Sequence, residues 1–368
     1  MTFPHWEPWS IFTSDRGTKF EYLKSHETPC VPDISRRDFL YLSLAGFMSL
    51  WVRPIEKFNT LLQEQFGRVT SPSIFIYDIP SFRGKEVNTC FRDEVFSITD
   101  ITTSEDGPLY NKVWYHLGNE GYAHSGAIQP VRKLINPVIY DIPRSGILAE
   151  VTVPYTDTYQ GPSTHYESSY RLYYETTHWI SNVADDNDGD AWYRIFDDKM
   201  KYSYYAPAKH LRLVPPGELS AISPNLPQEA KRIEVNLTEQ LITAYEWDRA
   251  VYIARASTGG KLSNGTYSTP IGNHTIFYKR PCRHMVNGDP EGSDFDLPGV
   301  PWVSYFTKSG IAIHGTYWHN NYGSVRSHGC VNISPQAAKW IYRWSHPTVP
   351  SNERDLIEYS GTKVDVIE

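Results

Sequence analysis

A histidine and a cysteine lie 16 residues apart near the C-terminus (330 − 314), and each has a glycine beside it. His314 follows the apolar run 311–313, which is typical of a strand, whereas Cys330 lies in the polar stretch 327–332. A thiol attacks a carbonyl carbon as the thiolate, and a nearby imidazole is the usual base that removes its proton. These residue types therefore predict a nucleophilic cysteine, Cys330, with His314 as its base.

The residues after the cysteine indicate a helix. Ser334 and Pro335 are typical of an N-cap and a first helical turn, so we expect a helix from about Pro335 to Trp344. A helix N-terminus carries partial positive charge, which would also favour the thiolate of Cys330. Gly329 lets a substrate approach the backbone closely and leaves its own amide unobstructed.

Two other interpretations of the cysteine compete with this one. A lone cysteine is commonly a small buried apolar residue, but Cys330 has polar residues and glycine around it. A metal site would draw on His314, His319, His328 and Cys330, yet His328 and Cys330 are closer in sequence than common zinc-ligand pairs. The nucleophile is the favoured interpretation, and no metal or cofactor is expected.

The same residues resemble the L,D-transpeptidase catalytic-domain family of bacterial cell-wall enzymes. The resemblance rests on His-Gly-Thr at 314–316 and on Ser-His-Gly-Cys-Val-Asn at 327–332. Further segments look like the family's opening strand pair, two turns and closing strand; they are 231–237, 240–245, 256–260, 268–272 and 361–366. The resemblance covers about residues 229–368.

This resemblance implies a peptidoglycan L,D-transpeptidase. Cys330 would attack the third residue of a tetrapeptide stem, and an amine of a second stem would resolve the acyl-enzyme to give a 3-3 cross-link. It also assigns the base to His314 and the orientation of that ring to the backbone carbonyl of Gly315. We expect amides near Gly329 and Cys330 to hold the oxyanion. His328 is either a supporting residue, which we favour, or an alternative base.

Other residues are candidates for shaping the substrate cleft. Ser327 and Asn332 would support the loop, and ordinary packing is the alternative for the aromatic members of the set. The candidate substrate-binding residues are Thr316, Tyr317, Trp318, Ser327, Asn332 and Tyr305.

Related functions stay open at this point. The same acyl-enzyme could serve an L,D-carboxypeptidase or attach a protein to the wall. A non-catalytic wall-binding protein is the alternative of a different class. Peptidoglycan stem peptides are the expected partners, and carbapenem-type inhibitors are expected acyl donors. Net charge is −7 without a basic tract, so nucleic acid is not an expected partner.

An export signal is predicted at the N-terminus. Residues 35–40 contain the twin-arginine pattern Ser-Arg-Arg-Asp-Phe-Leu, and the uncharged apolar run 39–52 follows. A run of this length is shorter than the roughly 20 residues that span a bilayer and fits a signal sequence. Residues 1–54 are therefore interpreted as a signal, either cleaved or kept as an anchor. They predict a location in the cell envelope, outside the cytoplasmic membrane.

The middle of the chain carries an internal repeat. The pairs Trp114-Tyr115 and Trp192-Tyr193 lie 78 residues apart (192 − 114), and each is followed by a strand with Tyr-Ala. This order resembles bacterial SH3-type modules, which would attach the enzyme to the wall or act as a rigid spacer.

The predicted fold class is mainly β. Two small SH3-like barrels are expected before a β-sandwich-like catalytic domain with one helix after Cys330. A loop rich in Gly, Asp and Pro, from Pro281 to Pro301, is expected to lie over the catalytic sheet as a lid. The expected domains are SH3-like modules at 55–140 and 141–214, a Pro-rich linker at 215–228 and the catalytic domain at 229–368.

Overall fold

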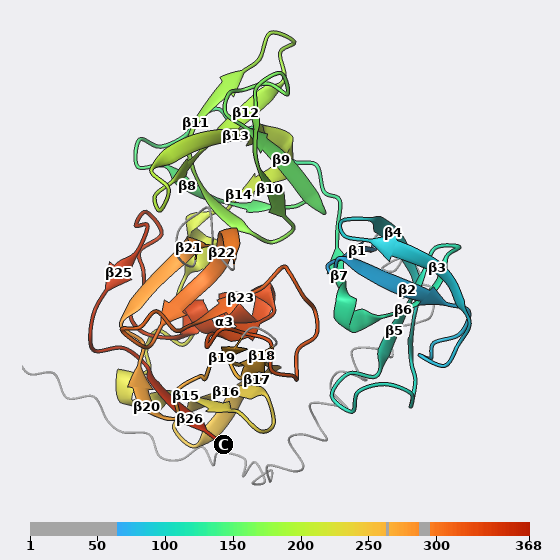
Figure 1. Ribbon diagram of the computed structural model, residues 1–368. Helices are drawn as coiled ribbons and strands as arrows, with labels where there is room; N and C mark the ends of the chain where they lie inside the picture. Colours follow the sequence, from blue (N-terminus) through green and yellow to red (C-terminus); the bar gives the residue numbers. More distant parts are fainter. Residues whose placement is uncertain (1–64, 263–264, 287–294) are drawn as a thin grey trace, which may run out of the picture. The chain divides into compact units, whose positions relative to one another are not determined.

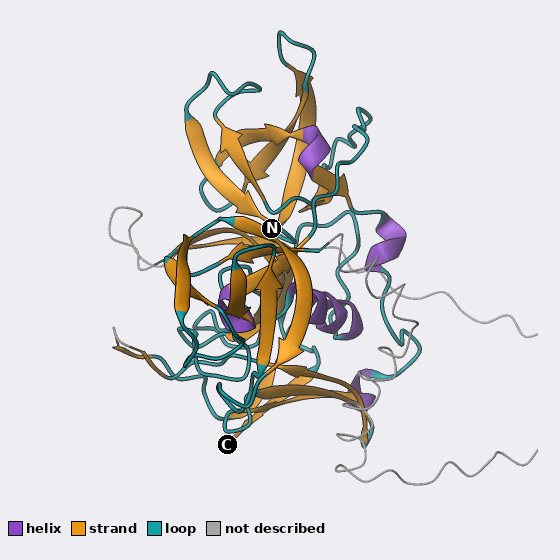
Figure 2. Ribbon diagram, turned by 90° about the vertical axis from the view of Figure 1, so that its right-hand side faces the viewer, coloured by secondary structure: helices purple, strands orange, loops and turns teal. Residues whose placement is uncertain are grey.

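The computed structural model describes residues 65–262, 265–286 and 295–368. These residues are mainly β, as predicted, and one α-helix is present among them (Figure 2). The predicted signal at 1–54 lies outside the described residues. Within the described part, no helix has the length and apolar character needed to cross a bilayer.

The first repeat forms a seven-stranded sheet, blue to teal in Figure 1. Its strand order is β3-β2-β6-β5-β4-β1-β7. The strands are β1 (Phe66–Val69), β2 (Ser73–Tyr77), β3 (Glu86–Phe91), β4 (Val95–Thr103), β5 (Val113–Leu117), β6 (Gly121–His124) and β7 (Ile128–Val131). A short 3-10 helix, η1 (Ser125–Ala127), links the last two.

The second repeat, green in Figure 1, has the same strand order displaced by seven strands, β10-β9-β13-β12-β11-β8-β14. Trp114 lies in β5 and Trp192 in β12, which are equivalent positions. The strands are β8 (Ile147–Val151), β9 (Tyr155–Tyr159), β10 (Ser168–Tyr173), β11 (Thr177–Asp185), β12 (Ala191–Asp197), β13 (Tyr202–Pro207) and β14 (Leu211–Leu213). The 3-10 helix η2 (Ala208–His210) precedes β14.

The repeat predicted from the two Trp-Tyr pairs is thus present as a repeated topology. Each sheet runs between two edge strands in this order, β3 and β7 in the first and β10 and β14 in the second. A closed SH3-like barrel is therefore not shown for the described residues.

The predicted Pro-rich linker is packed against the catalytic domain. It contains the 3-10 helices η3 (Pro216–Leu219) and, at its end, η4 (Gln228–Ala230). Leu219 and Ile222 pack against the core of the catalytic domain, and Glu218 forms ion pairs with Arg212 and Lys339. The segment is consequently held along its length by apolar and ionic contacts.

The C-terminal segment folds as two five-stranded sheets and a hairpin. One sheet has the order β17-β16-β15-β26-β20 and the other β24-β23-β22-β21-β25. The strands of the first are β15 (Lys231–Asn236), β16 (Leu241–Glu246), β17 (Arg249–Arg255), β20 (Gly272–Thr275) and β26 (Lys363–Ile367). Those of the second are β21 (Tyr278–Val286), β22 (Asp296–Tyr305), β23 (Ala312–Gly315), β24 (Val331–Ile333) and β25 (Leu356–Ile357). The hairpin is β18 (Lys261–Leu262) with β19 (Gly265–Thr266).

The core of this domain lies between its two sheets. Val235 and Val364 come from one sheet, Trp302 and Ile313 from the other, and all are buried in one cluster. The predicted opening strand pair is confirmed as antiparallel β15 and β16, and the closing strand β26 pairs with β15 in parallel. The buried residues of β15 and β26 alternate along each strand, because every second side chain faces the core.

The helix after the cysteine is confirmed as α3 (Pro335–Trp344). The side chain of Ser334 caps it by accepting a hydrogen bond from the amide of Ala337 at 3.2 Å. Ala337, Ile341 and Trp344 are buried, as their helical spacing predicted.

The predicted lid from Pro281 to Pro301 is wrong for its described residues. They belong to β21 and β22, which pair antiparallel with Cys282 opposite Pro301. Residues 287–294 lie outside the described part. The Pro and Gly content suggested a loop, but the two strands pair despite it. A register shift between Arg283 and Met285 accommodates the irregularity within the pairing.

Candidate active site

His314 lies on β23 with its ring buried. Its Nδ1 is 3.0 Å from the carbonyl oxygen of Gly315, so this nitrogen carries the proton and donates. The contact is the one that the family resemblance implies. It leaves Nε2 of the neutral ring with a lone pair, which is the form that a general base requires.

Burial lowers the pKa of His314 to about 4, although the hydrogen bond to Gly315 acts in the opposite direction. The ring is therefore neutral at pH 7. A neutral imidazole can accept a proton from the thiol, whereas a protonated one could not.

Cys330 stands immediately before β24, which runs parallel to β23. In this register His314 is opposite Asn332, so continuing the register by two residues sets Ala312 opposite Cys330. Alternate residues of a strand point to the same face, so extending this register one residue beyond β24 would set Cys330 on the face of His314. Strand pairing thus sets the segments that carry the two predicted catalytic residues beside each other.

The thiol is half-buried and lies against an apolar cluster. Its Sγ is 3.9 Å from the carbonyl oxygen of Gly310, and the cluster around it includes Ala312, Tyr305 and Trp318. Burial raises the pKa of Cys330 to about 11. The thiol is therefore protonated at neutral pH.

The pKa shifts of the two groups bear on the expected activation of Cys330. The resting site holds a neutral thiol and a neutral imidazole, not a thiolate, because burial disfavours both charged forms. The three-residue strand β24 also separates the cysteine from α3.

The turn before the cysteine is fixed by hydrogen bonds. The amide of Gly329 donates to Oγ of Ser327 at 3.1 Å, and that hydroxyl donates to the carbonyl oxygen of Cys330. Thr269 Oγ1 donates to the carbonyl oxygen of Gly329 at 2.7 Å. Gly329 has φ +109°, a conformation that other residues rarely adopt. Its amide is engaged by Ser327, so the expected oxyanion contact from Gly329 is not available in this state.

The side chain of His328 is exposed beside two aromatic rings. Its ring centroid is 4.3 Å from that of Tyr267 and 5.6 Å from that of Phe295. The ring therefore lies at the edge of the site, which favours the supporting role over that of a base.

The candidate substrate-binding residues fall into two groups. Thr316 and Tyr317 are buried, and their hydroxyls bind Tyr322 at 2.7 Å and the carbonyl oxygen of Pro298 at 3.1 Å. Trp318 and Tyr305 are half-buried and pack against the same apolar cluster as Cys330. The exposed parts of these two rings favour contact with a substrate, whereas the first two residues are placed to support the site.

The family model of the L,D-transpeptidase catalytic domain matches residues 230–366, the segment that contains this site.

Known relatives resemble parts of the chain. L,D-transpeptidase 2 of Mycobacterium tuberculosis is 29% identical over 92 residues, which are 22% of this chain and 22% of that protein. The structure of the Ldtfm–avibactam carbamoyl enzyme is 22% identical, with a TM-score of 0.29, and the match covers 38% of this chain and 49% of that one. The structure of L,D-transpeptidase 3 of M. tuberculosis with a faropenem-derived adduct is 18% identical, with a TM-score of 0.30. The match covers 46% of this chain and 74% of that one. The chain thus spans about a fifth of the curated relative and half of the first structure.

The matched segment also contains a histidine that the sequence analysis considered only as a metal ligand. His319 is buried, and its Nε2 accepts a hydrogen bond of 3.3 Å from Nδ2 of Asn332. Burial lowers the pKa of His319 to about 3. Asn332, on the strand facing His314, is thus held by a second neutral imidazole. No group of three or more His, Cys, Asp or Glu is placed to hold a metal ion in the described residues.

Proposed function

We propose that this protein is an exported peptidoglycan L,D-transpeptidase that works through an acyl-enzyme on Cys330. The observation that carries the proposal is the His314 ring. Its Nδ1 is hydrogen-bonded to the Gly315 carbonyl, and Cys330 directly precedes β24, the strand paired with the strand of His314, which supports the pairing of the two groups. The twin-arginine pattern in residues 35–40 supports export.

The first half-reaction follows from two neutral groups. His314 Nε2 takes the proton of the thiol as Sγ attacks the carbonyl carbon of the third stem residue. The tetrahedral intermediate then collapses, the C–N bond to the terminal D-alanine breaks, and His314 returns the proton to the leaving amine. The amide of Cys330 is the candidate oxyanion donor, because that of Gly329 already binds Ser327.

The second half-reaction reverses these roles. An amine of another stem attacks the thioester, His314 accepts its proton, and the sulfur leaves and is reprotonated. Water in place of the amine would give an L,D-carboxypeptidase. The half-buried rings of Trp318 and Tyr305 beside the thiol favour the amine, since apolar walls restrict water around the thioester.

Turnover of tetrapeptide muropeptides tests the proposal. Purified wild type should yield cross-linked dimers, and Cys330→Ala should yield none. Cys282→Ala is the matched control and should keep activity, because Cys282 is a free, half-buried cysteine on β21 that packs against the domain core. Tripeptides alone would show a carboxypeptidase, and no turnover by wild type would favour the non-catalytic wall-binding protein.

The pH dependence of alkylation tests the neutral resting pair. Iodoacetamide reacts with the thiolate, so its rate with Cys330 should rise about tenfold per pH unit between pH 7 and 10, in line with a pKa of about 11. A plateau near pH 6 would instead indicate a resting thiolate–imidazolium pair.

A further inference from the structure

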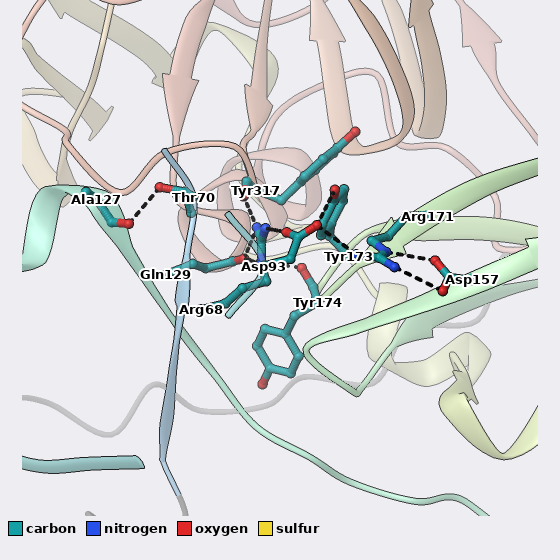
Figure 3. A network of polar contacts seen from close by, with 10 residues as sticks. All are labelled: Arg68, Thr70, Asp93, Ala127, Gln129, Asp157, Arg171, Tyr173, Tyr174 and Tyr317. Carbon is teal, nitrogen blue, oxygen red and sulfur yellow. Dashed lines mark hydrogen bonds and ion pairs between the residues drawn. The ribbon is translucent and has the colours of Figure 1, made fainter. Parts of the chain in front are cut away.

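The loop between His314 and Cys330 is held by the first repeat. In this loop, residues 316–326, the carbonyl oxygen of Tyr317 accepts a hydrogen bond of 2.5 Å from Nη2 of Arg68. Arg68 lies on β1, 249 residues away in the sequence. Figure 3 shows this contact together with the polar groups around the guanidinium.

Asn320 and Asn321 provide two more attachments of the loop to the first repeat. The backbone amide of Asn320 donates to the carbonyl oxygen of Gly126 at 3.2 Å. The side-chain amide of Asn320 donates to the carbonyl oxygen of Ser125, also at 3.2 Å. The side-chain amide of Asn321 is 3.1 Å from the hydroxyl of Tyr110. The loop is therefore fixed at three points by residues that precede it by about 200 positions.

Arg68 is built to hold its partner rigidly. The side chain is 2% exposed, and Gln129 and Asp93 bind its remaining nitrogens. Asp93 Oδ1 is 2.8 Å from Nη1, and the guanidinium carbon lies 4.2 Å above the ring of Tyr173. A planar guanidinium with every edge occupied has one orientation, so the carbonyl oxygen of Tyr317 is fixed with it.

A chain of aromatic contacts leads from Arg68 to the catalytic histidine. The ring of Tyr317 stacks on Tyr173 with centroids 5.1 Å apart, and Trp318 meets Tyr317 edge-on at 5.0 Å. The ring of Trp318 is 5.8 Å from that of His314 and shares the apolar cluster of Cys330. Movement of the Tyr317 backbone would therefore displace the wall beside both catalytic residues.

We propose that Arg68 is a positioning residue for the active site, and that the first repeat is a structural part of that site through the 316–326 loop. Only the expected change in the acylation rate of Cys330 rests on the proposed function; the change in loop exchange does not. The first repeat thus has a role that neither a spacer nor a wall-binding module requires.

Hydrogen–deuterium exchange and acylation kinetics of the full chain test this role together. In Arg68→Ala, amides of the 316–326 loop should exchange at least about tenfold faster while β22 and β23 keep their protection. The second-order rate constant for acylation of Cys330 by a carbapenem should fall between about 10- and 100-fold, as expected for a misplaced reacting group. Asn320→Ala should also speed exchange in the loop and slow acylation, both by smaller factors. It serves as the test variant if Arg68→Ala does not fold.

Arg232→Ala is the matched control, because Arg232 pairs with Glu234 on β15 and has no contact with the groups around Arg68. It should leave loop exchange and acylation unchanged. Native loop exchange and acylation in Arg68→Ala and Asn320→Ala would overturn the proposal, and so would equally faster exchange in all strands. If the wild type is not acylated, the proposed function fails, whereas loop exchange still decides the role of Arg68.

Discussion

The two seven-stranded sheets share one strand order and yet contact the catalytic domain in different ways. The first binds the 316–326 loop, chiefly by hydrogen bonds to backbone carbonyls. The second shares the apolar core of the catalytic domain, to which it contributes Leu148, Trp179 and Val214. The first sheet thus contacts the catalytic domain mainly through polar groups. The second contributes apolar side chains to its core and also stacks Tyr173 on Tyr317 of the loop.

Buried charges accompany the apolar contacts of the second sheet. His284 on β21 is bound by Asp197 at 2.5 Å and also by Asp296 on β22, and Arg280 forms an ion pair with Asp198. Thr177 Oγ1 donates to the carbonyl oxygen of Pro281 at 2.6 Å. These contacts secure the β21–β22 hairpin. The comparison predicts that changes where the second sheet contacts β21 and β22 alter stability, and that changes where the first sheet contacts the 316–326 loop alter catalysis.

The largest effect on stability is expected for Asp197→Ala. This change leaves the buried ring of His284 without the carboxylate at Nδ1, which should lower the free energy of unfolding by roughly 3–5 kcal/mol. Urea denaturation measures the loss, and the acylation rate per folded molecule should stay at the wild-type value. A loss below about 1 kcal/mol, or slower acylation, would break the comparison.

Gly323→Ala tests the first sheet without removing a polar group. Gly323 has φ +102°, and an added Cβ would lie 2.8 Å from Cβ of Tyr110. The strain should cost roughly 1–3 kcal/mol and slow acylation, since the loop must move from the first sheet. Gly189→Ala is the control because it has φ +83° in open space and should leave acylation unchanged. Equal acylation by the two variants would contradict the expected role of the loop.

Stability should depend on pH through His284. Burial alone would lower its pKa, but Asp197 and Asp296 outweigh burial and raise it above 6.5. A group whose pKa is higher in the folded state stabilises the protein when it is protonated. This stabilisation is complete below the unfolded-state pKa of about 6.5 and is lost as pH rises through the folded-state pKa. The free energy of unfolding should thus fall above pH 6.5, by at most about 1.4 kcal/mol per pH unit.

Denaturation midpoints between pH 6 and 9 measure this slope. Asp197→Asn should flatten it, since it removes the main cause of the raised pKa of His284. The other groups around His284 are His178 and the ring of Tyr170. An unchanged slope in Asp197→Asn would show that a group other than His284 causes the pH dependence of stability.

The smallest effect is expected for Arg171→Ala. The Arg171 side chain is 37% exposed, so its ion pairs with Asp93 and Asp157 are partly screened by solvent. The free energy of unfolding should change by less than about 1 kcal/mol. Thermal unfolding checks this value, and a loss of several kcal/mol would show that the network is cooperative beyond Arg68.

Local signals in the sequence predicted much of the catalytic domain. The cap Ser334 and the spacing of Ala337, Ile341 and Trp344 predicted α3 with its buried face. Glycine and proline counts failed for Pro281–Pro301, because pairing of β21 with β22 overrode them. Local patterns are reliable where one element determines its own conformation and less so where a partner strand does.

Other features depend on distant parts of the chain. The protonated state of Cys330 follows from burial by Tyr305, Trp318 and their neighbours, which the motif around the cysteine does not specify. The contact between Arg68 and Tyr317 spans 249 residues and has no local signal. Only the folded structure could associate the first repeat with the site.

The most direct test of the central claim is intact-mass analysis after a carbapenem is added, followed by peptide mapping. The account predicts one adduct per molecule, on Cys330, with Cys90 and Cys282 unmodified and no adduct in Cys330→Ala. An adduct that persists in Cys330→Ala, or an unmodified wild type that also turns over no muropeptide, would contradict a nucleophilic Cys330 activated by His314.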